Sequence, residues 1–263
     1  MISFIGNGNM GKAILGGILS TPEYRPEMIT VSDCNQEGLE ETRKKFGVGV
    51  TTDNKEAAQK ADILLLCVKP QILYSVIAEI RDVVNEECLI VSIAAGQSMD
   101  QIEAAFGREM KIARVMPNTP ALVGAGMSAI ATNLYVTGEE YQTLGEIFGS
   151  FGKTEFIPEH LMDAVTAVSG SSPAYIFMMI EAMADAAVAA GMPRAQAYTF
   201  AAQATLGSAK MVLETGMHPG ALKDMVCSPA GTTIEAVKAL EESGFRAAIM
   251  NAMQACVEKS KSL

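Results

Sequence analysis

Short β-rich runs alternate with helix-like stretches up to about residue 158 of this chain and then stop. The stretches between the runs, such as Glu37–Phe46 and Gln71–Ile80, carry apolar residues at helical spacing. This alternation predicts βαβ units and a mostly parallel sheet. Ile63–Val68 is apolar on both faces, which is typical of a central strand covered by helices on both sides. The runs are Ile2–Ile5, Met28–Val31, Ile63–Val68, Leu89–Ala94, Ile112–Met116, Met127–Ala131 and Thr154–Ile157.

The second part of the chain contains helix-like segments only and is rich in alanine and methionine. Gly191 and Gly216 stand where helix C-caps are expected. We therefore expect an α/β sheet domain over residues 1–158 and an all-α domain over residues 159–263. The segments read YIFMMIEAMADAAVAAGM, RAQAYTFAAQATLGSAKMVLETG, GTTIEAVKALEESG and FRAAIMNAMQACVEKS.

These helices are apolar nearly all round, and a domain of about 100 residues can bury only part of such a surface by itself. We expect the chain to bury the remainder by interlocking with a second copy. Ala164–Ile180 and Ala195–Ala209 are uncharged and could be mistaken for membrane spans. Both are alanine-rich and the first contains Ser-Gly-Ser-Ser-Pro, so we expect buried helices and no membrane partner.

Charge and cysteine usage narrow the function further. A formal net charge of -10 argues against binding to nucleic acid or anionic lipid and favours small-molecule or protein partners. The five cysteines show no CxxC spacing and the two histidines lie far apart, so neither disulfides nor a metal site are expected. We interpret the cysteines as small buried hydrophobes in a reducing compartment. Without a signal peptide before the run at Ile2, a cytoplasmic location is expected.

The sequence GNGNMG follows the first β-rich run and opens a helix from Lys12. In GxGxxG spacing, Gly6 suits the tight turn, Gly8 allows close approach to a pyrophosphate, and Gly11 allows helix–strand packing. The helix N-terminus adds free N–H groups and a positive dipole end. Because a βαβ series follows, we expect a Rossmann-type dinucleotide site here rather than a bare structural turn. Its other loop residues are Asn7, Asn9 and Met10.

Three further segments follow β-rich runs and are candidates for the same crevice. In a doubly wound sheet the ligand lies beyond the carboxyl ends of the strands, where a flat nicotinamide could lie against small residues and prolines. Each segment could equally be a stiffened loop without a binding role. They comprise Cys67, Val68, Lys69, Pro70 and Gln71, then Ala94, Ala95 and Gly96, then Met116 to Pro120 with Asn118.

Asp33 follows the second run and lies 22 residues after Gly11, where a carboxylate commonly accepts hydrogen bonds from the adenosine ribose. A carboxylate there disfavours a 2′-phosphate, and the nearest cation along the chain is Arg43. This spacing by itself favours NADH over NADPH. The alternative is that Asp33 caps the next helix.

Two polar segments, Val168–Tyr175 and Val226–Thr233, interrupt the apolar helices with small hydroxyl residues. Helix capping explains both, with Ser172 before Pro173 in the first. Binding is compatible with capping, because N–H groups at a helix start can hold a carboxylate. No Ser-His-Asp set or paired carboxylates lie beside these segments. Hydride transfer, in which the cofactor supplies the chemistry, needs few acid–base groups from the protein and is therefore consistent with these segments.

Motifs across nearly the whole chain resemble those of the pyrroline-5-carboxylate reductase family. The glycine loop is shared with many dehydrogenases, whereas the Ser-Pro-x-Gly-x-Thr helix start is characteristic of this family. The resemblance implies reduction of the C=N bond of 1-pyrroline-5-carboxylate to L-proline by NADPH or NADH, the last step of proline biosynthesis. The motifs are FIGNGNMGKAI, CVKPQ, SIAAG, RVMPNTP, SGSSPAY, HPGALKD and SPAGTTIEAVKALE, in the family's order.

The resemblance also implies roles for particular residues. Gly6–Gly11 would hold the pyrophosphate and Asn54 the adenosine end, while the nicotinamide riboside would lie against Val68, Lys69, Pro70 and Ala95. The substrate carboxylate and imine would be held by Ser228, Gly231, Thr232 and Thr233. In the family the helical domain forms an intertwined homodimer with each active site near the interface, and dimers often associate into a decamer.

The chemistry of the substrate agrees with these roles. N–H groups at the Ser228–Thr233 helix start would hold the carboxylate, and the Thr233 hydroxyl, our candidate catalytic group, would hydrogen-bond the ring nitrogen. Because a cyclic imine can enter already protonated, no strong side-chain acid is required.

The sequence departs from the family pattern at three places. Ser172 and Ala230 replace common glycines, and since both are small we expect fold and activity to survive. Ser32-Asp33-Cys34 replaces a segment in which NADPH-using relatives often carry a basic residue. We therefore expect both cofactors to be used, with NADH closer in efficiency than the family suggests.

Two other functions remain as alternatives. A β-hydroxyacid dehydrogenase would need a lysine on the helical side, and Lys210 and Lys223 are available outside the expected motif context. A non-catalytic dinucleotide-binding oligomer would not need the Ser228–Thr233 helix start.

Overall fold

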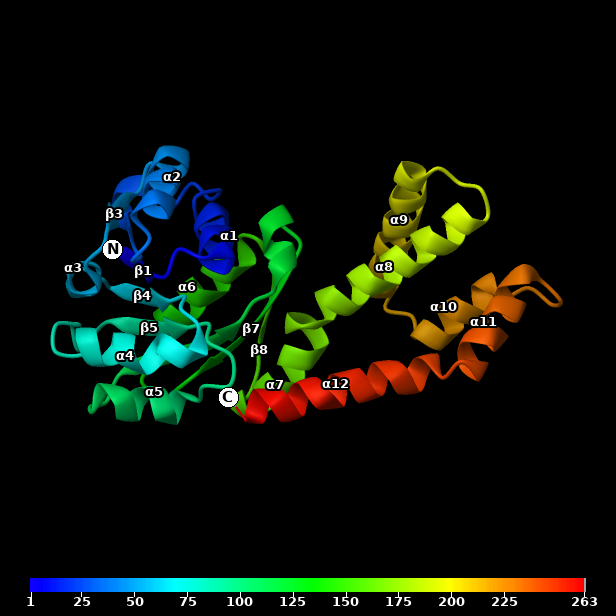
Figure 1. Ribbon diagram of the computed structural model, residues 1–263. Helices are drawn as coiled ribbons and strands as arrows, with labels where there is room; N and C mark the ends of the chain where they lie inside the picture. The colour runs from blue at the N-terminus through cyan, green and yellow to red at the C-terminus, as the bar shows by residue number, and fades with distance from the viewer. Residues whose placement is uncertain (263) are drawn as a thin grey trace. The chain divides into compact units, whose positions relative to one another are not determined.

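The protein, seen here in a computed structural model that describes residues 1–262, is built on an eight-stranded sheet (Figure 1). The strands lie in the order β3-β2-β1-β4-β5-β6-β7-β8, and neighbours are parallel except β6 and β7. This confirms the mostly parallel sheet expected from the alternating pattern. The strands are β1 Ile2–Ile5, β2 Ile29–Ser32, β3 Gly49–Thr51, β4 Ile63–Leu66, β5 Leu89–Ser92, β6 Lys111–Met116, β7 Gly126–Thr132 and β8 Gly152–Phe156.

Helices cover both faces of the sheet, as the apolar β4 run predicts. Buried side chains of α1, α2 and α6 pack on one face, and those of α3, α4 and α5 on the other. Leu65 of β4 belongs to the first core and Leu64 and Leu66 to the second, all three fully buried. The helices are α1 Asn9–Ile18, α2 Gln36–Phe46, α3 Asn54–Gln59, α4 Pro70–Ile80, α5 Met99–Phe106 and α6 Gly138–Gly149, and the short 3₁₀ turns are Pro26–Met28, Thr119–Val123 and Glu159–Leu161.

Some strand boundaries differ from those expected. The edge strand β3 is absent from the prediction because Gly49–Thr51 is only three residues long and lies among glycines. The runs ending at Val68 and Ala94 are longer than the strands β4 and β5, which end at Leu66 and Ser92. Val68 and Ala94 lie beyond these strand ends, and they are apolar because they pack into the core.

Helices alone follow β8, as expected. Gly216 caps α9 in the left-handed conformation, and Gly191 after α8 also has positive φ. The chain divides into two compact units, Ser172–Ala255 and the remainder. The domain boundary that we expect at residue 158 from the composition of the sequence stays a prediction. These helices are α7 Met162–Val165, α8 Ser172–Ala189, α9 Arg194–Thr215, α10 Pro219–Val226, α11 Thr232–Glu242 and α12 Phe245–Lys261.

The α-helical geometry is interrupted at Ser-Gly-Ser-Ser-Pro, as expected, and α8 begins at Ser172 with Pro173 as its second residue. Thr166–Gly170 form a π-helical turn between α7 and α8. The Ser171 amide bonds the Thr166 carbonyl, five residues back, at 2.8 Å. Small hydroxyl residues tolerate this widened turn, and Pro173 follows it directly.

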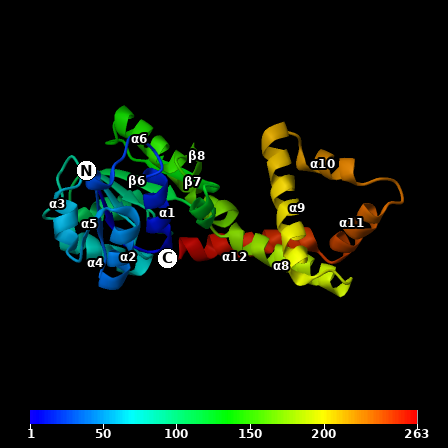
Figure 2. The same cartoon turned by 90° about the horizontal axis from the view of Figure 1, so that it is seen from above.

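The helices beyond residue 171 bury little within one chain, as expected for apolar helices whose remaining surface a second copy would cover. α8 and α9 pack against each other (Figure 2), where Ala184, Ala197 and Ala201 are buried. Large apolar side chains on the same helices stay exposed, including Phe177 at 62% and Phe200 at 66%. By length and composition alone, the continuous helix Glu159–Ala189 could also cross a membrane, and 6% of its apolar window is buried.

Candidate active site

The glycine loop joins β1 to α1 at the carboxyl edge of the sheet. Gly6 has φ +108, and a Cβ there would lie 2.4 Å from the Cys67 carbonyl oxygen, so only glycine fits. A Cβ on Gly11 would lie 2.7 Å from the Gly6 carbonyl oxygen. The loop and the first turn of α1 therefore pack backbone against backbone, next to the turn that follows β4.

The start of α1 is open above this loop. Gly8 is the N-cap residue, no side chain caps the helix, and a Cβ on Gly8 would meet no atom within 4 Å. Asn9 is exposed and Met10 packs partly against the core. An uncapped helix start behind an open glycine is the cradle that a pyrophosphate requires, so these residues fit a dinucleotide.

Asn7 faces the protein rather than the crevice. Its side chain donates to the Gly38 carbonyl at 2.8 Å and accepts from the Thr42 hydroxyl at 2.9 Å. Its backbone N–H donates to Asp33 Oδ2 at 2.7 Å. Asn7 thus ties the glycine loop to β2 and α2, and any contact with the cofactor would come from its backbone.

Asp33 is held in place by two backbone donors. Besides Asn7, the Asn35 N–H donates to its Oδ1 at 2.8 Å. The alternative role of Asp33 as helix cap is wrong, because Asn35 caps α2 by accepting from the Gly38 N–H. The carboxylate is therefore fixed at the end of β2, beside the glycine loop.

Asn54 also lies near this end of β2. Ser32 is fully buried, and its hydroxyl donates to Asn54 Oδ1 at 2.7 Å. The Asn54 amide then donates to Glu79 of α4 at 2.8 Å. The structure thus places Ser32, Asp33 and Asn54 together, with Asn54 oriented by hydrogen bonds from two elements.

The turns after β4 and β5 border the same edge, because β1, β4 and β5 are parallel neighbours. Lys69 is the N-cap residue of α4, with an exposed side chain and Pro70 at the first helical position. Burial raises the pKa of the Cys67 thiol to about 12, so this group stays neutral. Ala94 is buried, and Ala95 and Gly96 are partly exposed, Gly96 with φ +74.

Asn118 follows β6 at this edge, and its amide is engaged on both sides. Oδ1 accepts from the Met127 N–H at 2.9 Å, and Nδ2 donates to the Ser169 carbonyl at 3.0 Å. The side chain is 8% exposed. Its proposed cofactor contact stays a prediction, whereas its contacts within the protein are defined.

The second polar segment lies before α11 in the helical unit. Gly231 is the N-cap residue of α11 and no side chain caps this helix, so the expectation of capping is wrong here. The Ser228 hydroxyl occupies the space above Gly231, 2.3 Å from where its Cβ would be. Thr232 and Thr233 begin the helix, Thr233 half-buried. The start of α11 thus offers free N–H groups with three hydroxyls close by in sequence.

Ala230 has φ +56 and is the one non-glycine residue with positive φ among residues 1–262. This left-handed conformation turns the chain from Pro229 into the N-cap residue. Alanine holds it at a cost of about 1 kcal/mol that glycine would avoid. A strained residue directly before an uncapped helix start marks this turn as a functional candidate.

The acidic and basic side chains near this segment are exposed or engaged, and Glu235 in the first turn of α11 is exposed. His218 caps α10, its Nδ1 accepting from the Gly220 N–H at 3.0 Å. Lys223 is exposed and pairs with Asp224, which raises its pKa. Lys210 is exposed and pairs with Glu214 at 3.5 Å. Neither lysine has the desolvated setting of a proton-transfer group.

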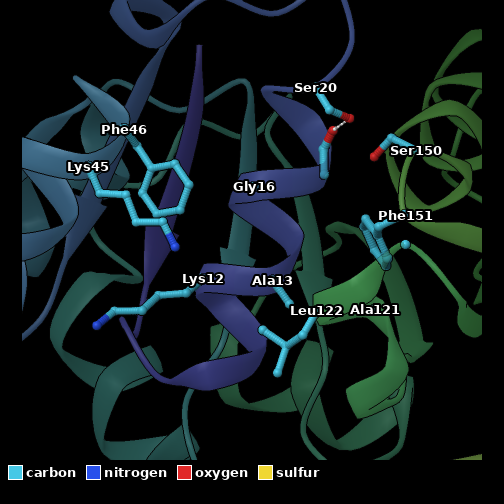
Figure 3. A pocket seen from close by; sticks show the side chains of 12 residues that line it. Lys12, Ala13, Gly16, Ser20, Lys45, Phe46, Ala121, Leu122, Ser150 and Phe151 are labelled. Atoms are coloured by element: carbon cyan, nitrogen blue, oxygen red, sulfur yellow. Dashed lines mark hydrogen bonds between the residues drawn. The ribbon is translucent and has the colours of Figure 1, made fainter.

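A pocket of about 300 Å³ runs along the body of α1 rather than at its start (Figure 3). Lys45 and Phe46 of α2 border α1 on one side and Phe151 on the other. The lining extends from Lys12 to Gly17 of α1 and on to Ser20 in the turn after the helix. This pocket is separate from the glycine cradle.

Several organising hydrogen bonds were not predicted from the sequence. The role of Asn35 had a signal, since an Asn three residues before the glycine of a helix first turn is a common N-cap pattern. The anchoring of Asn7 to Gly38 and Thr42, and of Asn118 to Ser169, had none, because these partners are far apart in sequence.

Comparison with known proteins gives the same picture over the whole chain. Residues 159–263 match a family model described as pyrroline-5-carboxylate reductase dimerisation, and residues 1–96 match one described as NADP oxidoreductase, coenzyme F420-dependent. The chain is 56% identical to the pyrroline-5-carboxylate reductase of Escherichia coli K12, covering 100% of this chain and 97% of the relative. It is 48% identical to that of Methanosarcina acetivorans at the same coverage. The solved structure of Plasmodium falciparum pyrroline carboxylate reductase with NADP bound is similar with TM-score 0.91 and 34% identity, covering 99% of this chain and 97% of that one.

Proposed function

Because the chain belongs to the pyrroline-5-carboxylate reductase family, we propose that it reduces 1-pyrroline-5-carboxylate to L-proline with NADPH or NADH. The observation that carries this function is the uncapped start of α11 behind Ala230, which would provide an anion site; Glu235 in the first turn of α11 is exposed. The dehydrogenase alternative loses its support, because Lys210 and Lys223 are both exposed and paired with carboxylates.

The crevice residues would hold the dinucleotide. Backbone N–H groups at Gly8 and Asn9 would hold the pyrophosphate at the start of α1, and Asp33 and Asn54 would lie toward the adenosine. Small residues after β4 and β5, with Pro70, would border the nicotinamide. The bound cofactor supplies the hydride, and the protein supplies binding and orientation.

The loop before α11 would hold the imine acid. N–H groups at Thr232 and Thr233 would hold the carboxylate, with the Ser228 hydroxyl beside Gly231 as a further donor. The Thr233 hydroxyl would hydrogen-bond the ring nitrogen and orient the C=N bond. An imine that is protonated on entry needs no proton from the protein, which matches the engaged His218 and exposed lysines.

The exposed apolar helices support self-association as a homodimer in which helices of two copies cover one another. The same packing would cover Glu159–Ala189, so a membrane is not needed to bury this helix. Further association into a decamer is proposed from the family alone. A cytoplasmic location is proposed because all five cysteines are free, which suits a reducing compartment and is testable by cell fractionation.

An assay of imine-dependent dinucleotide oxidation, combined with product analysis, tests the proposed function. Purified protein with NADPH or NADH should oxidise the dinucleotide only after 1-pyrroline-5-carboxylate is added, and amino-acid analysis should find L-proline in equal amount. A 3-hydroxy acid with the oxidised dinucleotide should give no turnover. Absence of imine-dependent oxidation with both dinucleotides would refute the assignment.

A further inference from the structure

The chain passes between its two compact units at two places, after Ser171 and before Cys256. Within the first unit these two segments are tied together. The Ser260 hydroxyl donates to Asp163 Oδ1 at 2.6 Å, and the Cys256 thiol lies 3.2 Å from the Ser171 hydroxyl. The segment that leads into the helical unit and the segment that comes back from it are therefore joined by these contacts. We call these two joined segments the base of the helical unit.

This base is anchored to the sheet through β6. Arg114, in the middle of β6 and 6% exposed, donates to Glu159 Oε1 at 3.2 Å. The same oxygen accepts from the Met99 N–H at 2.7 Å. The segment that leads to the helical unit thus starts from a fixed point on the sheet.

The other end of the segment that leads to the helical unit contains the π-helical turn, and Pro173 follows this turn. In an α-helical register the Ser169 carbonyl would accept from the residue four positions ahead, which is Pro173 and has no N–H. The Asn118 amide donates to this carbonyl instead, at 3.0 Å. A residue of the crevice loop therefore satisfies a backbone group that the helix itself leaves without its α-helical donor.

Asn118 is well placed to link the two regions. Its Oδ1 accepts from Met127 at the start of β7, so the side chain has little freedom to turn. Gly170 lies against Met116 of the same loop, its Cβ position 3.4 Å from the sulfur. The crevice loop Met116–Pro120 and the root turn, defined as Thr166–Ser171, thus contact each other at two points.

We propose that Asn118 is a positioning residue that couples dinucleotide binding in the crevice to the ordering of the root turn. A dinucleotide that fixes the crevice loop fixes Asn118, which holds the root turn through the Ser169 carbonyl. The root turn leads along the chain into the helical unit, which carries the loop before α11, so disorder in this turn is expected to weaken imine binding. The inference rests on the proposed function for its substrate, whereas the hydrogen bonds of Asn118 are independent of that function.

Asn118→Asp tests the coupling, because the change keeps the acceptor for Met127 and replaces the donor to Ser169 by an oxygen that repels it. Asn133→Asp is the matched control. Asn133 also bridges a backbone N–H and a carbonyl, those of Ile112 and Met110, at the opposite end of the β6–β7 pair. Hydrogen–deuterium exchange of residues 166–175, with and without NADPH, reports the root turn. Fluorescence titration gives the Kd of NADPH, and steady-state kinetics give the KM of the imine.

In the wild type and in Asn133→Asp, NADPH should slow exchange of the root turn. In Asn118→Asp, at NADPH concentrations that saturate the variant according to its measured Kd, the slowing should disappear, and the imine KM should rise about tenfold. Pro173→Ala, which restores a donor four residues after Ser169, should also reduce the slowing while the protein stays folded, and it covers the case in which Asn118→Asp does not fold.

NADPH that leaves root-turn exchange unchanged in the wild type would overturn the coupling while leaving the reductase assignment intact. Equal slowing in Asn118→Asp and the wild type would overturn it as well, because the effect would then pass by another route. A wild type that shows the slowing but no imine reduction would refute the proposed function and leave the coupling standing.

Discussion

At the scale of single residues, Asp33 shows how one carboxylate serves structure and specificity together. Its two oxygens accept from the backbone of Asn7 and Asn35, which holds the glycine loop against the end of β2. The same fixed negative charge lies where an adenosine ribose is expected, and Glu37 adds a second one in the first turn of α2. A 2′-phosphate would meet repulsion there, so we expect NADH to compete well with NADPH.

Replacing Asp33 by Asn should shift this preference. The amide keeps an acceptor for one of the two backbone donors but removes the charge, so the Kd of NADPH relative to that of NADH should fall about tenfold. Fluorescence titration of each reduced dinucleotide, without imine, measures both constants. Glu27→Gln removes an exposed charge at the other end of β2 and should leave the ratio unchanged. An unchanged ratio in Asp33→Asn would show that this carboxylate does not select the cofactor.

The Thr233 hydroxyl is expected to act on the imine itself. Thr233→Val keeps the shape of the side chain but removes a hydrogen bond at a desolvated centre. The fall in kcat/KM should correspond to a loss of about 1–3 kcal/mol in the free energy of transition-state binding. Thr199→Val, on the exposed face of α9, is the matched control. Steady-state kinetics of both variants decide the role, and Thr233→Val with wild-type kcat/KM would remove Thr233 from the mechanism.

At the scale of elements, two uncapped helix starts carry the site. Both α1 and α11 have glycine as N-cap residue and no capping side chain, whereas α2, α3, α5 and α6 are capped by Asn35, Asp53, Ser98 and Thr137. A capping side chain would occupy the N–H groups that an anion needs. α4, α7 and α9 also lack a capping side chain, with Lys69, Leu161 and Pro193 as their N-cap residues. α1 and α11 combine the missing cap with a glycine N-cap residue, and these two helices are expected to meet the pyrophosphate and the substrate carboxylate.

The strain at Ala230 belongs to the start of α11. Ala230→Gly relieves the left-handed conformation but adds freedom to the unfolded chain, so we expect a gain of up to about 1 kcal/mol in unfolding free energy. Ala236→Gly, in the interior of α11, should instead cost about 1 kcal/mol. Urea denaturation at one fixed protein concentration compares the two, because self-association contributes to stability. A loss of stability in Ala230→Gly would contradict the strain.

At the scale of the whole molecule, the helical unit has too little internal packing to account for its composition. Its exposed apolar side chains, on α8 and α9 especially, would be costly in water unless a second copy covers them. We therefore expect self-association to contribute to the stability of this unit.

Phe200→Asp should weaken that association. Phe200 is 66% exposed in the single chain, and a buried carboxylate in its place would lose apolar contact worth about 1.5–3 kcal/mol and add desolvation. Light scattering at micromolar concentration should give a dimer or larger species for the wild type and a smaller mass for the variant. Leu134→Asp, 85% exposed in the turn after β7, should leave the mass unchanged. A monomeric wild type would contradict the interlocking of two copies.

Local sequence patterns were enough to predict the alternation of strands and helices, the mostly parallel sheet and the glycine loop, because periodicity and turn residues act over a few neighbouring positions. The composition of the helices also indicated self-association, since apolar helices without enough core need a partner. The folded chain was needed to show that Asn118 reaches Ser169, that Asp33 binds Asn7 and that Thr166–Gly170 form a π-helical turn. These features depend on hydrogen-bond partners brought together by folding, and on a carbonyl that Pro173 leaves without a donor. No local pattern in the chain specifies which distant side chain will supply one.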